Sequence, residues 1–414
     1  MPRRKRGKMV KKAPVESAGR SIDTLPDGVL QHIIGFLPAR DAVRTCVLAR
    51  RWRDLWMFAT GLRIISNCDD DVAELREFVD HLLLTRGIAP LETFELRFDG
   101  ISADDFCEGD VLRVNLWCRH AIRCQVRALR FLFSQCDFPF ELCDLHLVSR
   151  HLVKLELAGL VVMEDFLDLT SCPALEQLEI ENCDLCLAKK ISYESLKHLI
   201  ITACEFSYYA RARIHAPSLV SLLLDGNLLS TPVLESMPSL VDGSIRIVEN
   251  HMDTCVCCNS IDGSCQVTIP GNCTCILLEG LSEAKNLALI AESETFIFKK
   301  DLRQCPTFSK LKTLLLSDYL CVALDLDAIT CILKHSPVLE RLTLELFRQG
   351  SGHKMLMKGS YSPVHTAAAI SEHLKIVEVK CEVFDERVYK VLKLLCTFNI
   401  RKLINNAIEI FQYF

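Results

Sequence analysis

The chain has 414 residues, half of them apolar and 24% charged, which excludes a disordered chain and at ~150 residues per domain predicts two or three domains. Its 22 cysteines fall short of the ~8–10% that marks a small disulfide-rich secreted protein. No apolar run approaches the ~18 residues of a membrane span, and the N-terminus lacks the apolar stretch of a signal peptide. We therefore expect reduced thiols, no membrane partner, and a place in the nucleus or cytoplasm.

The net charge of −5 is unevenly distributed. Residues 1–20 contain eight basic residues and one acidic residue, so they carry +7 and the rest of the chain carries −12. They also lack apolar periodicity, which predicts a disordered basic tail. The run Arg3-Arg4-Lys5-Arg6 suits a nuclear localisation signal and equally a solvated tail. Because the body is acidic, we expect no nucleic-acid partner.

Residues 21–60 have the pattern of three short helices. Leu30, Ile33 and Leu37 recur at helical spacing, and further apolar faces include Val47 and Trp52. About forty residues cannot enclose this many large side chains, so some must contact either the following domain or a partner. Composition alone favours the following domain.

A Leu-x-x-Leu-x-Leu pattern, with other apolar residues tolerated at its leucine positions, recurs over residues 91–379. Its copies begin at Leu91, Val126, Leu152, Leu175, Leu196, Leu219, Leu311, Leu339 and Leu374. The central copies are 23, 21 and 23 residues apart, within the ~20–29-residue period of leucine-rich repeats. Cys183, Cys204 and Asn227 stand three residues after their copies, where such repeats have Asn or Cys.

Each copy predicts a short strand followed by a turn and a return segment. One copy cannot bury its own apolar face, so neighbouring copies must stack. We therefore predict an α/β fold in which a small helical domain precedes a curved repeat array over residues 61–370. The array has an irregular insert at residues 240–280, and residues 109–124 predict a helix in an early return segment.

The helical segment resembles the F-box of plant F-box proteins with leucine-rich repeats. The matching residues run from Leu25-Pro26-Asp27 through Leu37-Pro38 to Trp52 and Trp56, and a repeat array follows directly, as in that family. Residues 371–400 are similar in part to the FBD region of such proteins. Residues 401–414 depart from it and form a C-terminal tail.

The resemblance implies a non-enzymatic substrate receptor of the Skp–cullin–F-box ubiquitin ligase. The F-box would bind a Skp-family adaptor and, through it, a cullin, while the repeats would bind an unidentified protein substrate. The residues that match adaptor-contacting or core positions of the F-box are Leu25, Pro26, Leu30, Ile33, Leu37, Val43, Val47, Leu48, Trp52 and Trp56.

The substrate is expected on the concave face of the array, because residues between the repeat leucines point away from the core. The candidates are Glu156, Glu179, Lys197, His198, Ser221, Thr313, Arg341 and Glu378. Two other functions stay open: a nuclear scaffold outside any ligase, suggested by the basic tail, and a sensor in which the repeats hold a small hormone-like ligand.

The sequence contains no glycine-rich phosphate loop, His-Glu-x-x-His motif or Gly-x-Ser-x-Gly elbow, so we expect no catalytic residue and no cofactor. Six cysteines crowd into residues 255–275, and Cys255, Cys257, Cys273 and Cys275 are the weak candidates for zinc ligands. Their spacing does not give the paired Cys-x-x-Cys motifs of common structural sites, and cysteine also fills repeat interiors as a small hydrophobe. We therefore expect no metal.

Overall fold

The fold is seen in a computed structural model. It describes residues 22–66, 71–100, 108–134, 140–142, 147–163, 167, 169–207, 211–226, 231–247, 277–291, 301, 305–317, 327–346, 373–381, 386–397 and 408–412. Within these ranges, no helix is both long and apolar enough to cross a bilayer. The weak zinc candidates Cys255, Cys257, Cys273 and Cys275, Asn227 and the basic residues 1–20 lie outside the described residues.

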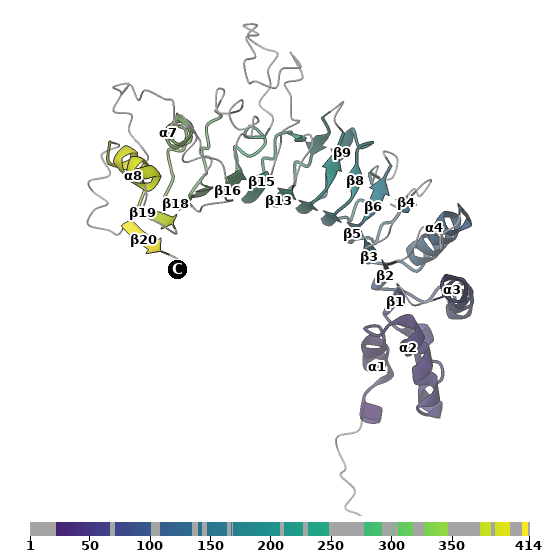
Figure 1. The fold of residues 1–414 in the computed structure, drawn as a ribbon. Coiled ribbons are helices and arrows are strands. Elements are labelled where there is room, and N and C mark those ends of the chain that lie inside the picture. The colour runs from purple at the N-terminus through teal and green to yellow at the C-terminus, as the bar shows by residue number, and fades with distance from the viewer. Residues whose placement is uncertain are drawn as a thin grey trace, which may run out of the picture.

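A helical unit comes first (Figure 1). It consists of η1 (Ile22–Thr24), α1 (Asp27–Ile34), α2 (Ala39–Arg44), η2 (Thr45–Val47), η3 (Arg50–Trp52) and η4 (Leu55–Phe58), where η marks a 3-10 helix. Pro26 and Pro38 directly precede α1 and α2, where a missing backbone N–H leaves no bond unmade. The third expected helix is the pair of short segments η3 and η4, because Ala49 is extended and Asp54, at φ −114° and ψ 0°, departs from helical geometry.

Among the described residues, thirteen parallel strands then form one sheet in which the strand order follows the chain. They are β1 (Gly61–Ser66), β2 (Thr93–Asp99), β3 (Ala128–Ser134), β5 (Lys154–Ala158), β7 (Gln177–Glu181), β10 (His198–Thr202), β13 (Ser221–Gly226), β15 (Asp242–Ile247), β16 (Asn286–Ala291), β17 (Thr313–Ser317), β18 (Arg341–Leu346), β19 (Ile376–Cys381) and β20 (Ile408–Gln412). Parallel neighbours need a crossover connection, and those connections supply a second layer.

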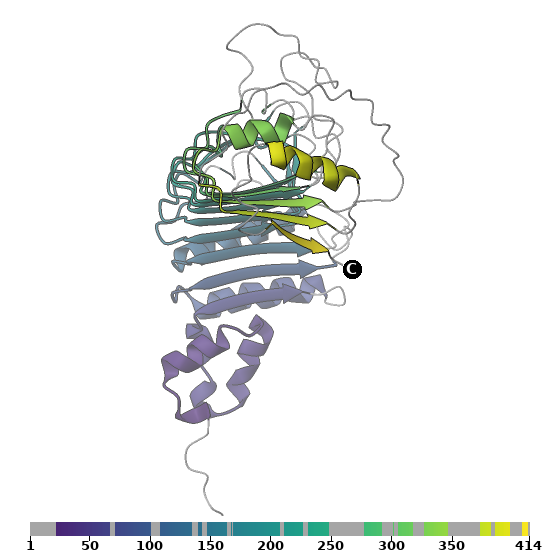
Figure 2. The same ribbon diagram turned by 90° about the vertical axis from the view of Figure 1, so that its left-hand side faces the viewer.

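The second layer lies on the outer side of the curved sheet (Figures 1 and 2). Its helices are α3 (Val72–Arg86), α4 (Glu108–Arg123), α7 (Asp327–Lys334) and α8 (Glu386–Thr397). Between them lie two small sheets, one of β4 (Phe140–Leu142), β6 (Leu160–Val162), β8 (Asp184–Leu185) and β11 (Glu205–Phe206), and one of β9 (Lys190–Ser192), β12 (Arg213–His215) and β14 (Val233–Leu234). The helix predicted at residues 109–124 is confirmed as α4.

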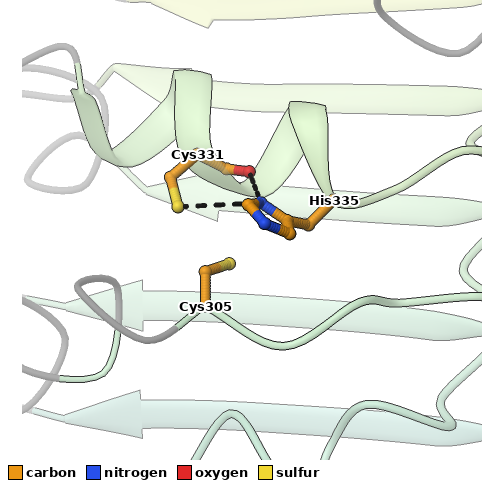
Figure 3. Close-up of side chains that lie close together, drawn as sticks. All are labelled: Cys305, Cys331 and His335. Carbon is orange, nitrogen blue, oxygen red and sulfur yellow. Dashed lines mark hydrogen bonds between the residues drawn. The ribbon is translucent and has the colours of Figure 1, made fainter.

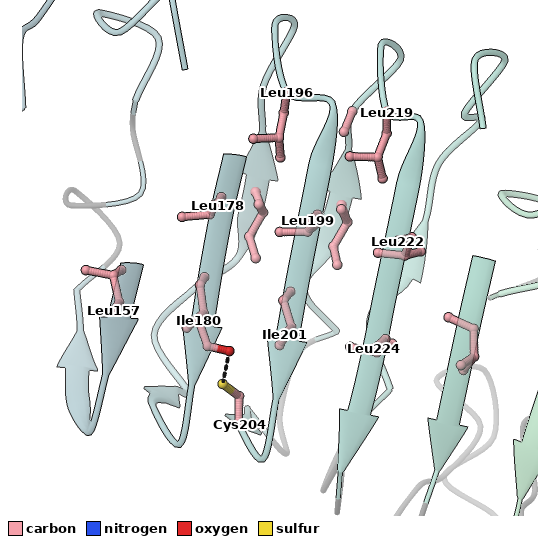
Figure 4. Packing of buried hydrophobic residues seen from close by; sticks show 14 of the residues in the cluster. Leu157, Leu178, Ile180, Leu196, Leu199, Ile201, Cys204, Leu219, Leu222 and Leu224 are labelled. Atoms are coloured by element: carbon pink, nitrogen blue, oxygen red, sulfur yellow. Dashed lines mark hydrogen bonds between the residues drawn. The ribbon is translucent and has the colours of Figure 1, made fainter. Parts of the chain in front are cut away.

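The repeat leucines build the core between these layers (Figure 4). Leu178, Leu199 and Leu222 stand in register on β7, β10 and β13, and none is more than 1% exposed. Alternate residues of each strand face the other way, so the inward apolar side chains of each repeat extend a continuous cluster along the sheet. The leucines of the repeat pattern therefore lie in the interior of one stack of repeats.

A column of turns follows the strands. Gly159, Asn182, Ala203 and Gly226 each have a positive φ, and the first three donate their N–H to the neighbouring repeat at 2.8–3.0 Å. A Cβ on Gly159 would overlap the carbonyl oxygen of Phe133, so only glycine fits there.

The two cysteines predicted at the Asn/Cys position of the repeat lie directly after these turns. Cys183 and Cys204 are buried, and the Cys204 thiol donates to the carbonyl oxygens of Thr202 (3.3 Å) and Ile180 (3.5 Å). The hydrogen bond with Cys183 and burial raise the pKa of Cys204, so its thiol stays protonated. These two cysteines thus fill the repeat interior as the sequence indicates.

Two predicted boundaries differ from the structure. The irregular insert at 240–280 contains β15, a regular strand of the main sheet, which the sequence obscures because Gly243 stands where the neighbouring strand has the core residue Leu222. The boundary at residue 370 does not end the sheet, since β19 and β20 continue it. The FBD-like region and the C-terminal tail therefore share the sheet of the repeats.

Candidate functional site

The helical unit has a small core of its own. Leu30, Ile34, Trp52, Leu55 and Ala59 are at most 6% exposed and pack together. Arg51 closes the unit at its start: its guanidinium donates to Asp27 Oδ1 from Nε at 2.8 Å and from Nη2 at 2.5 Å, and to the Leu25 carbonyl oxygen at 2.5 Å. The beginning of α1 is thereby held against η3.

The same unit exposes large apolar side chains. Val47 is 82% exposed, Leu48 65%, Phe36 58% and Phe58 55%, and Val29 and Ile33 are exposed to a lesser degree. We call these six residues the apolar patch. Exposed apolar side chains in this number, on a unit that has its own core, are typical of a surface that contacts another protein.

The ten predicted adaptor-binding residues therefore fall into three groups. Leu30 and Trp52 are buried in the core of the unit. Leu25, Leu37, Val43 and Trp56 are half-buried, and Pro26, Ile33, Val47 and Leu48 are exposed. Val29, Phe36 and Phe58 are not among the residues predicted from the sequence. Val29, Ile33 and Phe36 recur at i, i+4 and i+7, a second helical face that could have revealed the first two.

The helical unit is joined closely to the sheet. Gly35 and Gly61 pack backbone to backbone, and a Cβ on Gly35 would lie 2.5 Å from the Gly61 nitrogen. Arg86, on α3, is 5% exposed and donates from Nη2 to the Ala59 carbonyl oxygen at 2.6 Å and from Nη1 to the Ala89 carbonyl oxygen at 3.1 Å. Burial lowers the pKa of its guanidinium. Side-chain and backbone contacts thus fix the apolar patch relative to the strands.

The concave face of the sheet has a central row of residues, one per strand, which the register aligns. On the first five strands this charged row is Arg63, Glu95, Arg130, Glu156 and Glu179. Glu95, 1% exposed, lies 3.1–3.7 Å from the guanidinium groups of Arg63, Arg97 and Arg130. Positive and negative side chains alternate across most of this row, so its charges are largely paired within the chain.

The next five strands continue the same row without charge. This uncharged row is Ile200, Leu223, Ser244, Ala288 and Leu315, all half-buried. Thr343 follows, and Glu378 on β19 restores a charge. The central row of the concave face is therefore uncharged in its middle and charged at its ends.

The eight predicted substrate-binding residues lie on or beside β5–β19 and do not converge on one point. Lys154 bonds Glu156 at 2.6 Å and Glu179 at 2.9 Å; burial acts to lower the pKa of Lys154, but these two bonds raise it. Arg341 bonds Glu378 at 2.8 Å.

Lys197 bonds Glu176 at 2.6 Å. The remaining three candidates, His198, Ser221 and Thr313, flank the uncharged row: each lies two residues before its member on the same strand. Five candidates therefore have charges that are already paired within the chain, and the other three lie beside the uncharged row.

Comparison with known proteins adds to this geometry. The family model of the F-box domain matches residues 22–57, the helical unit. F-box/LRR-repeat protein 13 of Arabidopsis thaliana is 27% identical over 259 residues, 55% of this chain and 57% of the relative. Two F-box/FBD/LRR-repeat proteins of the same plant are each 25% identical, one over 90% of this chain and 88% of its own, the other over 78% and 76%.

The chain spans 57% of the length of each of the first two relatives and most of the length of the longer matches. Neither the matched domain nor the names of these relatives indicates an enzyme. The names of these relatives combine an F-box with leucine-rich repeats and, in the two longer matches, an FBD region.

Proposed function

We propose that this chain, which belongs to the plant F-box/FBD/LRR-repeat family, is the non-catalytic substrate receptor of a Skp–cullin–F-box ubiquitin ligase. The observation that carries the proposal is the apolar patch on a unit that already has its own core. A buried core needs no further partner, but an exposed patch of this kind does.

The adaptor-binding surface is assigned to the exposed part of the F-box. Val47 and Leu48 follow α2, and Ile33 and Phe36 lie at the end of α1, so a Skp-family adaptor would bury apolar anchors from two elements. A few such anchors carry most of the binding energy of an interface. Leu30 and Trp52 do not contact the adaptor but hold these elements in place from the core of the unit.

The main sheet serves as a curved leucine-rich-repeat solenoid that holds the substrate. The uncharged row suits this role because its residues have no ion-pair partners to displace and lose little hydration on burial. His198, Ser221 and Thr313 supply hydrogen-bonding groups along its edge. The substrate is then a protein segment with an apolar side chain and polar neighbours.

The rigid junction explains how binding becomes ubiquitination without chemistry by this chain. Arg86 and the Gly35–Gly61 contact fix the F-box to the first strand, so a substrate on the sheet is held at a constant place relative to the adaptor. A fixed placement raises the effective concentration of a substrate lysine near the conjugating enzyme.

We propose that the protein acts in the nucleus, the cytoplasm, or both. The basic run Arg3-Arg4-Lys5-Arg6 motivates nuclear import. Replacing its four basic residues with alanine in a fluorescent fusion should shift the protein towards the cytoplasm, and an unchanged distribution would remove the run as a signal.

The test is affinity purification from plant cells of the wild type and three aspartate variants. Leu48→Asp changes the apolar patch, Leu223→Asp changes the uncharged row, and Leu187→Asp changes a leucine that is 52% exposed elsewhere on the surface. We expect Leu48→Asp to lose adaptor and cullin while it keeps substrate. Leu223→Asp should keep adaptor and cullin and lose substrate, and Leu187→Asp should keep all of them.

The proteins recovered with the wild type test the proposal directly. Recovery of Skp-family adaptor and cullin with the wild type and with Leu187→Asp, but not with Leu48→Asp, supports it. A wild-type preparation that contains its protein partners but neither adaptor nor cullin would favour a scaffold outside the ligase.

A further inference from the structure

Three side chains that commonly bind metal ions meet beside α7, on the outer side of the sheet (Figure 3). Cys331 lies on α7 and His335 directly follows it, while Cys305 lies in the segment that leads into β17. Their ligand atoms are all within 4.8 Å of one another, and all three residues are half-buried. The cluster is separate from the F-box and from the concave face.

The helix sets the orientation of two of the three side chains. Cys331 and His335 are four residues apart, so they share one face of α7. His335 Nδ1 lies 2.8 Å from the Cys331 carbonyl oxygen and 3.8 Å from its Sγ. Because a carbonyl oxygen only accepts hydrogen bonds, Nδ1 carries the proton, and Nε2 keeps the lone pair that a metal ion needs.

The third side chain is held in place by a backbone bond. The N–H of Phe308, three residues after Cys305, donates to the carbonyl oxygen of His335 at 2.8 Å. Phe308 is fully buried, as is Ile329 on α7. The two segments are therefore packed and hydrogen-bonded together next to the cluster.

We propose that Cys305, Cys331 and His335 bind one zinc ion through two thiolates and the imidazole Nε2, with water as the fourth ligand. Thiolate and imidazole are the ligands zinc prefers, and Zn–S bonds of about 2.3 Å place two tetrahedral ligands about 3.8 Å apart. The ligand atoms of the three residues already lie within 4.8 Å of one another, so the cluster is near this spacing. Each cysteine releases its thiol proton on binding, so affinity falls as the pH is lowered.

The ion would tie α7 to the segment before β17. Its ligands come from positions 26 residues apart, and α7 packs over the C-terminal strands (Figure 1). Because a folded site binds the ion and an unfolded chain holds it less well, zinc is expected to stabilise this end of the sheet.

The experiment is a titration of the reduced, metal-free full-length chain with Co²⁺, which reports thiolate coordination by its absorption, followed by zinc competition. The wild type is compared with Cys305→Ser, Cys331→Ser, His335→Ala and the matched control Cys186→Ser, a half-buried cysteine outside the cluster. The cysteines at 255–275 contribute equally to every variant, so the differences isolate this site. We expect each cluster variant to bind one equivalent less than the wild type and Cys186→Ser.

Stability gives a second measurement that does not depend on the spectrum. Zinc should raise the unfolding midpoint of the wild type and of Cys186→Ser, and should raise it less in Cys331→Ser and in His335→Ala. Equal metal uptake by the wild type and the cluster variants would overturn the proposal. So would a Cys305–Cys331 disulfide that forms without loss of metal binding.

Discussion

Large apolar side chains are buried in the repeat sheet, whereas several of them are exposed on the F-box unit. On the sheet, Leu199 and Leu222 are at most 1% exposed, and the chain itself covers the inward side chains of the described repeats. On the F-box, Val47 and Leu48 are 82% and 65% exposed although the unit has a packed core. The described part of the sheet therefore covers its own apolar side chains, whereas the F-box leaves large apolar side chains exposed, where we propose that an adaptor binds.

The largest effect expected from this comparison is on stability. Leu199→Ala opens a cavity in the sheet core and should lower the free energy of unfolding by about 3 kcal/mol. Leu48→Ala removes the same atoms from an exposed side chain and should change that energy by less than about 0.5 kcal/mol. Urea unfolding measures both; similar losses would show that the patch is part of the core.

The charged row is expected to resist substitution more than ordinary surface charges do. Glu95→Gln keeps the shape of the side chain but leaves Arg63, Arg97 and Arg130 without their shared carboxylate, so it should cost about 2 kcal/mol. The exposed Glu181→Gln is the control, with an expected change below about 0.5 kcal/mol. A cost for Glu95→Gln as small as that of the control would contradict the buried network.

The junction between the two regions should depend on Arg86. Arg86→Met keeps the apolar stem and removes the bonds to the Ala59 and Ala89 carbonyl oxygens, which should cost about 1–2 kcal/mol. It should also loosen the F-box, seen as faster amide hydrogen exchange in η4 and at the start of β1 with little change at β10 and β13. Uniform exchange across the chain would argue against a local joint.

The smallest expected effect concerns an exposed charge cluster on the sheet. Hydrogen bonds from Lys375 and Lys312 lower the pKa of Glu340 to about 2. Because this value lies below the ordinary value of 4.5, the stabilisation is present above about pH 4.5 and is lost as the pH falls towards 2. The difference in unfolding midpoint between the wild type and Glu340→Gln should be slight near neutral pH, since salt and water screen the pairs, and should vanish in acid.

The strands that could be predicted from the sequence were those marked by the short, recurring leucine pattern. The spacing of Leu175, Leu196 and Leu219 predicts strands that the structure contains. Each repeat shows in its own sequence which side chains are buried, because its leucines fall at the core positions. The pattern does not predict β15, because Gly243 stands at a core position where the neighbouring strand has Leu222.

Features that depend on register or on distant contacts were not readable. Glu95 meets Arg63 and Arg130 only because separate strands align them, and the uncharged row shows itself only after that alignment. Cys305 and Cys331 are 26 residues apart in the chain, and the fold of the segment between them decides their meeting. Within α7, the i, i+4 spacing of Cys331 and His335 was the one local signal.

Direct binding to a purified Skp-family adaptor tests the central claim most simply. Size-exclusion chromatography and calorimetry of the full-length chain should show a one-to-one complex that Leu48→Asp abolishes and that Leu187→Asp and Leu223→Asp leave intact. Failure of the folded wild type to bind, or equal binding by Leu48→Asp and Leu187→Asp, would contradict the account.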